Sequence, residues 1–186
     1  MGTQDDDSAR FTRLYAQWYG HVLAYARRRV QEHTARDVTA ETFLVAWRRM
    51  EEVPDDPLPW LYGVARRVLA NETRRAARAD RLAGKVARQP VQHGPDTADR
   101  VTGGIDDVLT ALPEADRELL RLLAWEDLST AQAAKVLGCR PATLAVRLHR
   151  ARRRLRALLD QRAGSARPRS PRARRCPDAS FGNRRP

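Results

Sequence analysis

The sequence predicts an all-α protein of two small helical domains joined by a flexible linker, with a helix-turn-helix ending the second domain. Three observations predict this arrangement. First, apolar residues recur at a spacing of about 3.6 residues in two stretches of the chain. Second, a segment rich in glycine and proline separates these stretches. Third, Ser129–Arg156 carries the start and stop residues of two helices joined by a tight turn. The expected divisions are a first domain over 8–81, a linker over 82–104, a second domain over 105–160 and a disordered basic tail over 161–186.

Two amphipathic helices are expected at the start of the first domain. Ser8 is a candidate N-cap for the first, and Thr34 with Asp37 resembles a capping box that opens a second helix ending near Met50. The apolar positions of the first helix are Phe11, Leu14, Tyr15, Trp18, Val22, Tyr25, Ala26 and Val30. Those of the second are Val38, Phe43, Ala46, Trp47 and Met50. Each helix therefore has one face for a shared core.

A loop and a basic helix complete the first domain. Three prolines and a cluster of acids oppose helix formation over Glu51–Pro59, and apolar spacing resumes from Trp60 to Leu69. The later part of this third helix carries arginines opposed only by Glu72 and Asp80. These arginines are Arg66, Arg67, Arg74, Arg75, Arg78 and Arg81. Their uncompensated charge indicates contact with nucleic acid.

The second domain follows a linker, Gly84–Gly104, that has no hydrophobic period. Helical patterning restarts over Ile105–Leu112 and again from Pro113, where Glu114 and Asp116 suit the positive end of a helix dipole. Beyond it the helix-turn-helix begins. Ser129 is expected to cap its first helix, Gly138 to end that helix, and Pro141 to lie in the first turn of the second.

The second helix of this motif has two different faces. An apolar stripe suited to packing is formed by Leu144, Leu148, Ala151, Leu155 and Leu158. Arginines occupy most of the remainder, with no acidic residue among them: Arg147, Arg150, Arg152, Arg153, Arg154 and Arg156. Such a helix suits the major groove of DNA, whereas a charged helical hairpin of no DNA-binding function is the simpler alternative. For Arg152–Arg156, attraction to phosphate is favoured over contact with bases.

Composition narrows the function classes. The net charge of +12 indicates a polyanionic partner, and half of it lies in residues 163–186, where seven arginines stand against Asp178. No apolar run approaches the length that spans a bilayer, and the N-terminus is acidic, unlike a signal peptide, so a cytoplasmic protein without membrane insertion is expected. Cys139 and Cys176 form no metal-ligand spacing. Scattered histidines and the absence of a phosphate loop argue against an enzyme, a cofactor or a metal.

Four segments in order resemble the extracytoplasmic-function (ECF) class of bacterial RNA polymerase sigma factors. They are ARDVTAETFLVAWRRM from Ala35, PWLYGVARRVLANETRR from Pro59, ALPEADRELLRLLAWEDLS from Ala111 and ATLAVRLHRARRRL from Ala142. The resemblance implies a transcription initiation factor with two domains. The first, region 2, would bind core RNA polymerase through its second helix and capture the melted −10 promoter element with its loop and third helix. The second, region 4, would read the −35 element.

The resemblance also implies individual site residues. Asp37 and Glu41 match the acids of the polymerase-binding helix, although Ala40 stands where the family usually has glutamine. In the recognition helix, Ala145 and Val146 replace a basic residue and a serine, so thymine methyl contact is a physical alternative there. The DNA-binding candidates are Arg66, Arg67, Arg74, Arg75, Thr143, Ala145, Val146, Arg147, His149, Arg150 and Arg153.

Core RNA polymerase, promoter DNA and an anti-sigma factor are therefore the expected partners. The alternative hypothesis is a stand-alone helix-turn-helix regulator that binds an operator as a dimer, and an enzyme comes third. The basic tail admits three explanations: nonspecific DNA affinity, contact with a regulator, or translation in a wrong reading frame.

Overall fold

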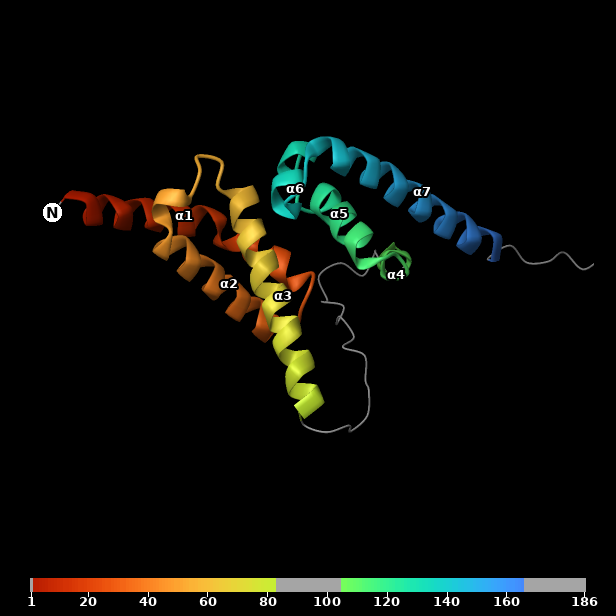
Figure 1. Cartoon of the computed structure of the whole chain (residues 1–186), viewed down its shortest axis with the longest axis horizontal. Coiled ribbons are helices and arrows are strands. Elements are labelled where there is room, and N and C mark those ends of the chain that lie inside the picture. Colours follow the sequence, from red (N-terminus) through yellow and green to blue (C-terminus); the bar gives the residue numbers. More distant parts are fainter. Residues whose placement is uncertain (1, 83–104, 166–186) are drawn as a thin grey trace, which may run out of the picture.

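The computed structural model describes residues 2–82 and 105–165, and all regular structure in these two ranges is helical. The predicted all-α class is therefore confirmed (Figure 1). The elements are α1 (Gly2–Arg27), α2 (Glu32–Arg48), the short 3-10 helix η1 (Met50–Glu52), α3 (Leu58–Leu82), α4 (Ile105–Thr110), α5 (Glu114–Ala124), α6 (Thr130–Leu137) and α7 (Pro141–Ser165). The predicted linker after Leu82 and the predicted tail after Ser165 lie outside the described residues.

The first three helices pack together as predicted, but two of their starts differ from the prediction. Helix α1 begins at Gly2, so Ser8 lies inside it, where its carbonyl accepts the hydroxyl of Thr12 at 2.8 Å. Helix α2 begins at Glu32 after Gln31, which makes no side-chain cap. The acid in its first turn, Glu32, favours a helix start and also pairs with Arg27 and Arg36. Because the helix starts at Glu32, the capping box predicted at Thr34 and Asp37 is wrong.

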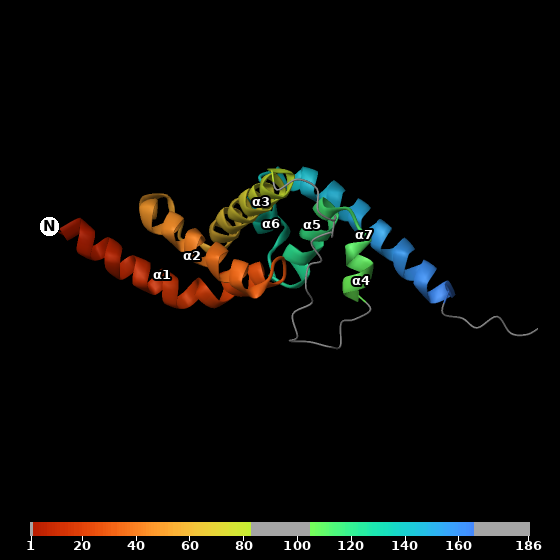
Figure 2. The ribbon, with the colours of Figure 1, turned by 90° about the horizontal axis from the view of Figure 1, so that it is seen from below.

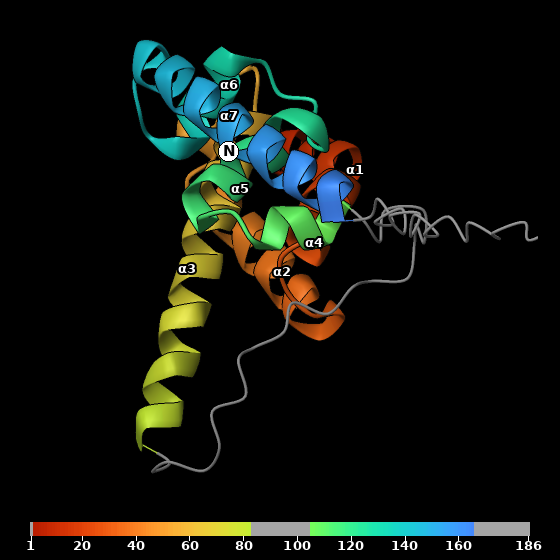
Figure 3. The ribbon, with the colours of Figure 1, turned by 90° about the vertical axis from the view of Figure 1, so that its right-hand side faces the viewer.

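The proline-rich segment breaks the helical path as predicted. Helix α2 ends at Arg48, η1 follows, and α3 starts at Leu58, so the irregular part ends two residues earlier than the predicted Glu51–Pro59, and Glu51 and Glu52 lie in η1. Buried positions of α3 continue to Leu69. Beyond it the helix projects away from the other helices (Figure 3).

The helix-turn-helix forms as predicted. The Ser129 hydroxyl accepts the amide of Gln132 at 3.2 Å and the Gln132 side chain accepts the amide of Ser129 at 3.0 Å, which completes a capping box. Gly138 ends α6 with φ of 64°, a conformation that favours glycine, and Pro141 is the first residue of α7. Helix α7 runs to Ser165, five residues beyond the predicted end of the second domain.

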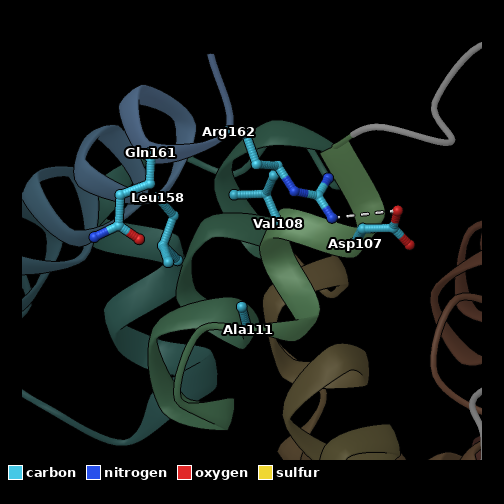
Figure 4. A pocket seen from close by; sticks show the side chains of 6 residues that line it. All are labelled: Asp107, Val108, Ala111, Leu158, Gln161 and Arg162. Carbon is cyan, nitrogen blue, oxygen red and sulfur yellow. Dashed lines mark ion pairs between the residues drawn. The ribbon is translucent and has the colours of Figure 1, made fainter. Parts of the chain in front are cut away.

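The far end of α7 is supported by α4. Arg162 lies 3.4 Å from the carboxylate of Asp107, beside a shallow pocket of about 280 Å³ lined also by Leu158 and Val108 (Figure 4). The pair is exposed and adds little stability, but it places α4 beside the part of α7 that continues past the predicted end of the domain.

The two halves of the chain touch each other directly. Helix α3 lies against α6, and buried residues of both halves belong to one continuous cluster (Figure 2). The sequence predicted two domains on a linker but gave no indication of this contact.

Candidate nucleic-acid interface

Helix α7 presents its candidate DNA-binding side chains to solvent. Leu144, Leu148 and Ala151 are buried against α5 and α6, as the apolar stripe predicted. The opposite face is open. Its exposed candidates are Thr143, Ala145, Val146, His149, Arg150 and Arg153, and Arg147 is half-buried.

One arginine of α7 has a structural partner that the sequence did not reveal. Arg154 pairs with the carboxylate of Asp116, which is 7% exposed on α5. The two residues are 38 positions apart, so no local spacing indicates the pair. Arg154 therefore links α7 to α5, although its side chain, like those of Arg152 and Arg153, is exposed.

Helix α3 carries a second basic surface in the other half of the chain. Arg66, Arg67, Arg74 and Arg75 are all exposed. Arg74 donates to the side chain of Asn71 at 2.7 Å, and Arg75 lies 3.9 Å from Glu72, at the limit of an ion pair. These four residues are available to a polyanion.

The acidic candidates lie on a different surface. Asp37 and Glu41 are exposed on α2, on the same helical face as Leu44, which is 47% exposed. Trp47, which was predicted to be buried, is 42% exposed because it packs at the edge of α1, with its ring centroid 5.1 Å from that of Phe11. Acids beside exposed apolar side chains suit a protein partner more than DNA.

The loop between α2 and α3 is anchored at both ends. Met50, Val53 and Pro57 are buried, and the turn 54–56 between them is exposed. From α1, Arg10 donates from Nη1 to the Met50 carbonyl at 3.1 Å and from Nη2 to the Val53 carbonyl at 2.6 Å. The sequence reading gave Arg10 no role, since its partners are 40 and 43 residues away.

Two arginines of α1 and two glutamates of the second half form an ion-pair cluster, here called the bridging cluster: Arg28, Arg29, Glu118 and Glu126. Arg29 donates from Nε and Nη2 to Glu118 at 2.9 and 3.2 Å, and from Nη1 to Glu126 at 3.1 Å. Arg28 donates from Nη2 to Glu126 at 2.6 Å. The side chain of Glu126 is 1% exposed and that of Arg29 is 9% exposed, so the pairs are largely dry.

Two tyrosines complete the bridging cluster. The guanidinium carbon of Arg29 lies 3.5 Å from the ring centroid of Tyr25, which stacks on Tyr62 at 4.7 Å. The Tyr25 hydroxyl donates to Glu118 at 2.9 Å. Burial raises the pKa of Tyr25 above its ordinary value, against the opposing effect of Arg29, so the hydroxyl remains a donor. The sequence reading placed Tyr25 in the core and missed the charged residues around it, which lie 89 to 98 positions from their partners.

A second contact joins the halves at the loop. The side-chain nitrogen Nε2 of Gln132 on α6 donates to the carboxylate of Asp56 at 3.0 Å. The exposed turn of the first half therefore lies against the start of the helix-turn-helix. By contrast, α2 and the outer part of α7 lie at opposite ends of the molecule (Figures 1 and 2).

Within the described ranges, no group of three or more His, Cys, Asp or Glu residues is arranged to hold a metal ion. No helix among them combines the length and the apolar character needed to cross a membrane.

Comparisons with known proteins agree on one family. The profile described as sigma-70 region 2 matches residues 14–79, and the profile described as sigma-70, region 4 matches residues 103–155. The ECF RNA polymerase sigma factor SigL of Mycobacterium tuberculosis is 33% identical over 170 residues, covering 86% of this chain and 94% of its own length. The ECF RNA polymerase sigma factor SigM of Bacillus subtilis is 28% identical over 138 residues, covering 70% and 82%.

Two solved structures are similar in fold. One is the sigma factor RpoE in complex with the anti-sigma factor NepR from Bartonella quintana, with a TM-score of 0.61, 24% identity, and coverage of 81% of this chain and 97% of that one. The other is CnrH in complex with the cytosolic domain of CnrY, with a TM-score of 0.57, 28% identity and coverage of 83% and 90%.

Proposed function

The chain belongs to the ECF class of the sigma-70 family of RNA polymerase sigma factors, and on this premise we propose how its surfaces divide the work of promoter recognition. A sigma factor binds core RNA polymerase and directs initiation at specific promoters. Here α2 docks on the polymerase through Asp37 and Glu41. The loop before α3, with Arg66, Arg67, Arg74 and Arg75, holds the opened −10 strand, and α7 reads the −35 duplex.

The observation that carries this proposal is the separation of charge by surface. The exposed face of α7 and the exposed arginines of α3 are basic, whereas the exposed surface of α2 mixes the acids Asp37 and Glu41, the apolar Leu44 and Trp47, and the arginines Arg36 and Arg48. Basic surfaces attract phosphates, and a mixed acidic and apolar surface suits a protein. A stand-alone regulator that binds an operator as a dimer would also use a protein-binding surface, so a pull-down against core polymerase is what distinguishes it from a sigma factor.

Helix α7 has the side chains for reading a duplex. Arg147, His149 and Arg150 have donors that reach base edges in the major groove, and exposed Ala145 and Val146 suit the methyl group of thymine. Arg153 meets phosphate. These assignments extend the predicted division into 8–81 and 105–160, which the two matched regions support.

An anti-sigma factor is a further partner. NepR is an anti-sigma factor, and it is bound to RpoE in one of the two similar structures. We expect an equivalent protein to restrain this chain, at surfaces that polymerase or DNA would otherwise occupy.

The test compares polymerase complexes on two templates. One template is fully paired promoter DNA, and the other has a preformed bubble at the −10 element. Replacing residues 54–56 by Gly-Ser-Gly should abolish the effect of base changes in the opened strand, because unstacked bases need a surface to receive them. An Arg150→Ala protein should instead lose discrimination at the −35 duplex alone. If the loop replacement leaves base preference at the opened strand unchanged, the loop does not read the −10 element.

A further inference from the structure

Among the described residues, the turn 54–56 of the loop between α2 and α3 makes no backbone hydrogen bond, although bonds from Glu52 to Arg49 and from Leu61 to Pro57 lie at the two ends of the loop. Pro54 and Pro57 have no amide hydrogen. The Val53 amide does donate to the Met50 carbonyl at 3.2 Å. The turn 54–56 that follows is exposed, so its position depends on how firmly its base is held.

Arg10 supplies that hold from a different helix. Its guanidinium spans the carbonyls of Met50 and Val53 with two donors, and the Met50 carbonyl already accepts one backbone bond, so Arg10 fills its second acceptor site. Hydrogen bonds from a charged donor are stronger than neutral ones. A planar fork can hold two carbonyls in one orientation, whereas lysine is a point charge on a flexible stem.

We propose that Arg10 is a positioning residue for promoter reading: it fixes the loop in the shape that receives an opened base. This inference rests on the proposed function of the loop and adds a residue outside it. Without Arg10 the loop would populate several shapes, and the apparent affinity for the strand would fall with the fraction that is competent. Arg10 itself does not touch the DNA.

The test is a double-mutant cycle in complexes with core RNA polymerase. Arg10→Ala, the Gly-Ser-Gly replacement of residues 54–56, and their combination are compared with the unchanged protein. The probe is a fluorescein-labelled single strand that carries the −10 sequence preferred by the unchanged complex, measured against the same strand with one base altered. Arg13→Ala is the matched control, since Arg13 is exposed on the same helix.

Arg10→Ala removes both hydrogen bonds to the loop, and it should lower affinity for the preferred strand, and the preference over the altered strand, by at least about tenfold. Arg10→Lys should recover part of the loss. In the replaced-loop background, Arg10→Ala should have no further effect, because Arg10 acts through the loop. Affinity for core polymerase and helicity should stay unchanged in every variant.

The outcomes separate the two hypotheses. If Arg10→Ala lowers strand affinity equally in both loop backgrounds, Arg10 contacts DNA itself and the positioning role is wrong. If the loop replacement abolishes base preference but Arg10→Ala leaves it intact, only the role of Arg10 fails. If the loop replacement has no effect on base preference, the proposed function of the loop fails and the role of Arg10 fails with it. Weakened polymerase binding by Arg10→Ala and Arg10→Lys alike would show a general structural role instead.

Discussion

Neutralising Glu126 should release the two halves of the protein from each other. The Glu126 carboxylate accepts hydrogen bonds from both arginines of the bridging cluster. Glu126→Gln therefore leaves one positive charge uncompensated at a site where the side chain of Arg29 is 9% exposed. Removing one partner of a buried ion pair costs about 3 to 5 kcal/mol. Because Arg28 is 32% exposed and Arg29 keeps Glu118, we expect about 2 to 3 kcal/mol, a shift of about 30-fold to 150-fold toward the separated state.

The distance between the two promoter elements requires the two halves of the protein to separate. The −10 and −35 elements lie about 25 base pairs apart, or about 85 Å at about 3.4 Å per pair. In the closed arrangement Asp56 of the loop lies 3.0 Å from Gln132 of the helix-turn-helix. The halves must therefore separate before each can occupy its own element, and Glu126→Gln should strengthen promoter binding in proportion.

The separation can be followed by energy transfer between two dyes. Cysteines at the exposed positions Ala70 on α3 and Ala157 on α7 would carry them, with Cys139 and Cys176 replaced by alanine. As urea is raised, loss of transfer before loss of helicity reports separation of the halves. The midpoint for that loss should fall in Glu126→Gln.

Glu32→Gln is the matched control. It makes the same chemical change in a carboxylate that pairs with Arg27 and Arg36 within the first half. Exposed pairs of this kind contribute little, so its midpoint for separation should equal that of the unchanged protein. Equal midpoints for Glu126→Gln and Glu32→Gln would refute the reasoning that the bridging cluster holds the halves together.

Three further predictions concern the partners. Asp37→Ala with Glu41→Ala should weaken binding to core polymerase without loss of helicity, because both acids are exposed; unchanged affinity in a pull-down would contradict the docking assignment. Arg147→Ala or Arg150→Ala should cost about 1 to 3 kcal/mol in binding to −35 duplexes if the arginine contacts guanine, and less if it contacts only phosphate. Competition between duplexes that differ in this base distinguishes the two cases. Deleting residues 163–186 removes seven arginines and should flatten the dependence of nonspecific DNA binding on salt, as titration at several salt concentrations would show.

Local chemistry made much of the fold predictable. The starts and stops at Ser129, Gly138 and Pro141 depend on neighbours in sequence, and all three were predicted and found. The start of α2 was misplaced because Gln31 makes no side-chain cap, and the ion pairs of Glu32 stabilise the helix start instead. Sequence spacing alone does not show that these ion pairs outweigh a capping residue at Thr34. Helix periodicity likewise identified the buried stripe of α7.

Long-range partners were beyond the reach of sequence reasoning. The sequence analysis assigned no role to Arg10 or Arg29 and expected Arg154 to meet phosphate, yet each is bonded to a residue 38 or more positions away. The exposure of candidates such as Asp37 agrees with the sequence reading, because helical periodicity alone decides which face is apolar. Their roles in binding polymerase and DNA remain predictions.

The charges of the bridging cluster also determine the distance over which the separated halves attract each other. Once apart, the first half carries two extra cations and the second two extra anions. At physiological ionic strength their attraction is screened beyond about 8 Å. Reclosure therefore depends on chance re-encounter of two halves of one chain, and the bridging cluster attracts them only at the last step of contact. A partner that binds only the separated halves must therefore supply the free energy that opens them, but once it is bound the cluster exerts no attraction across the gap.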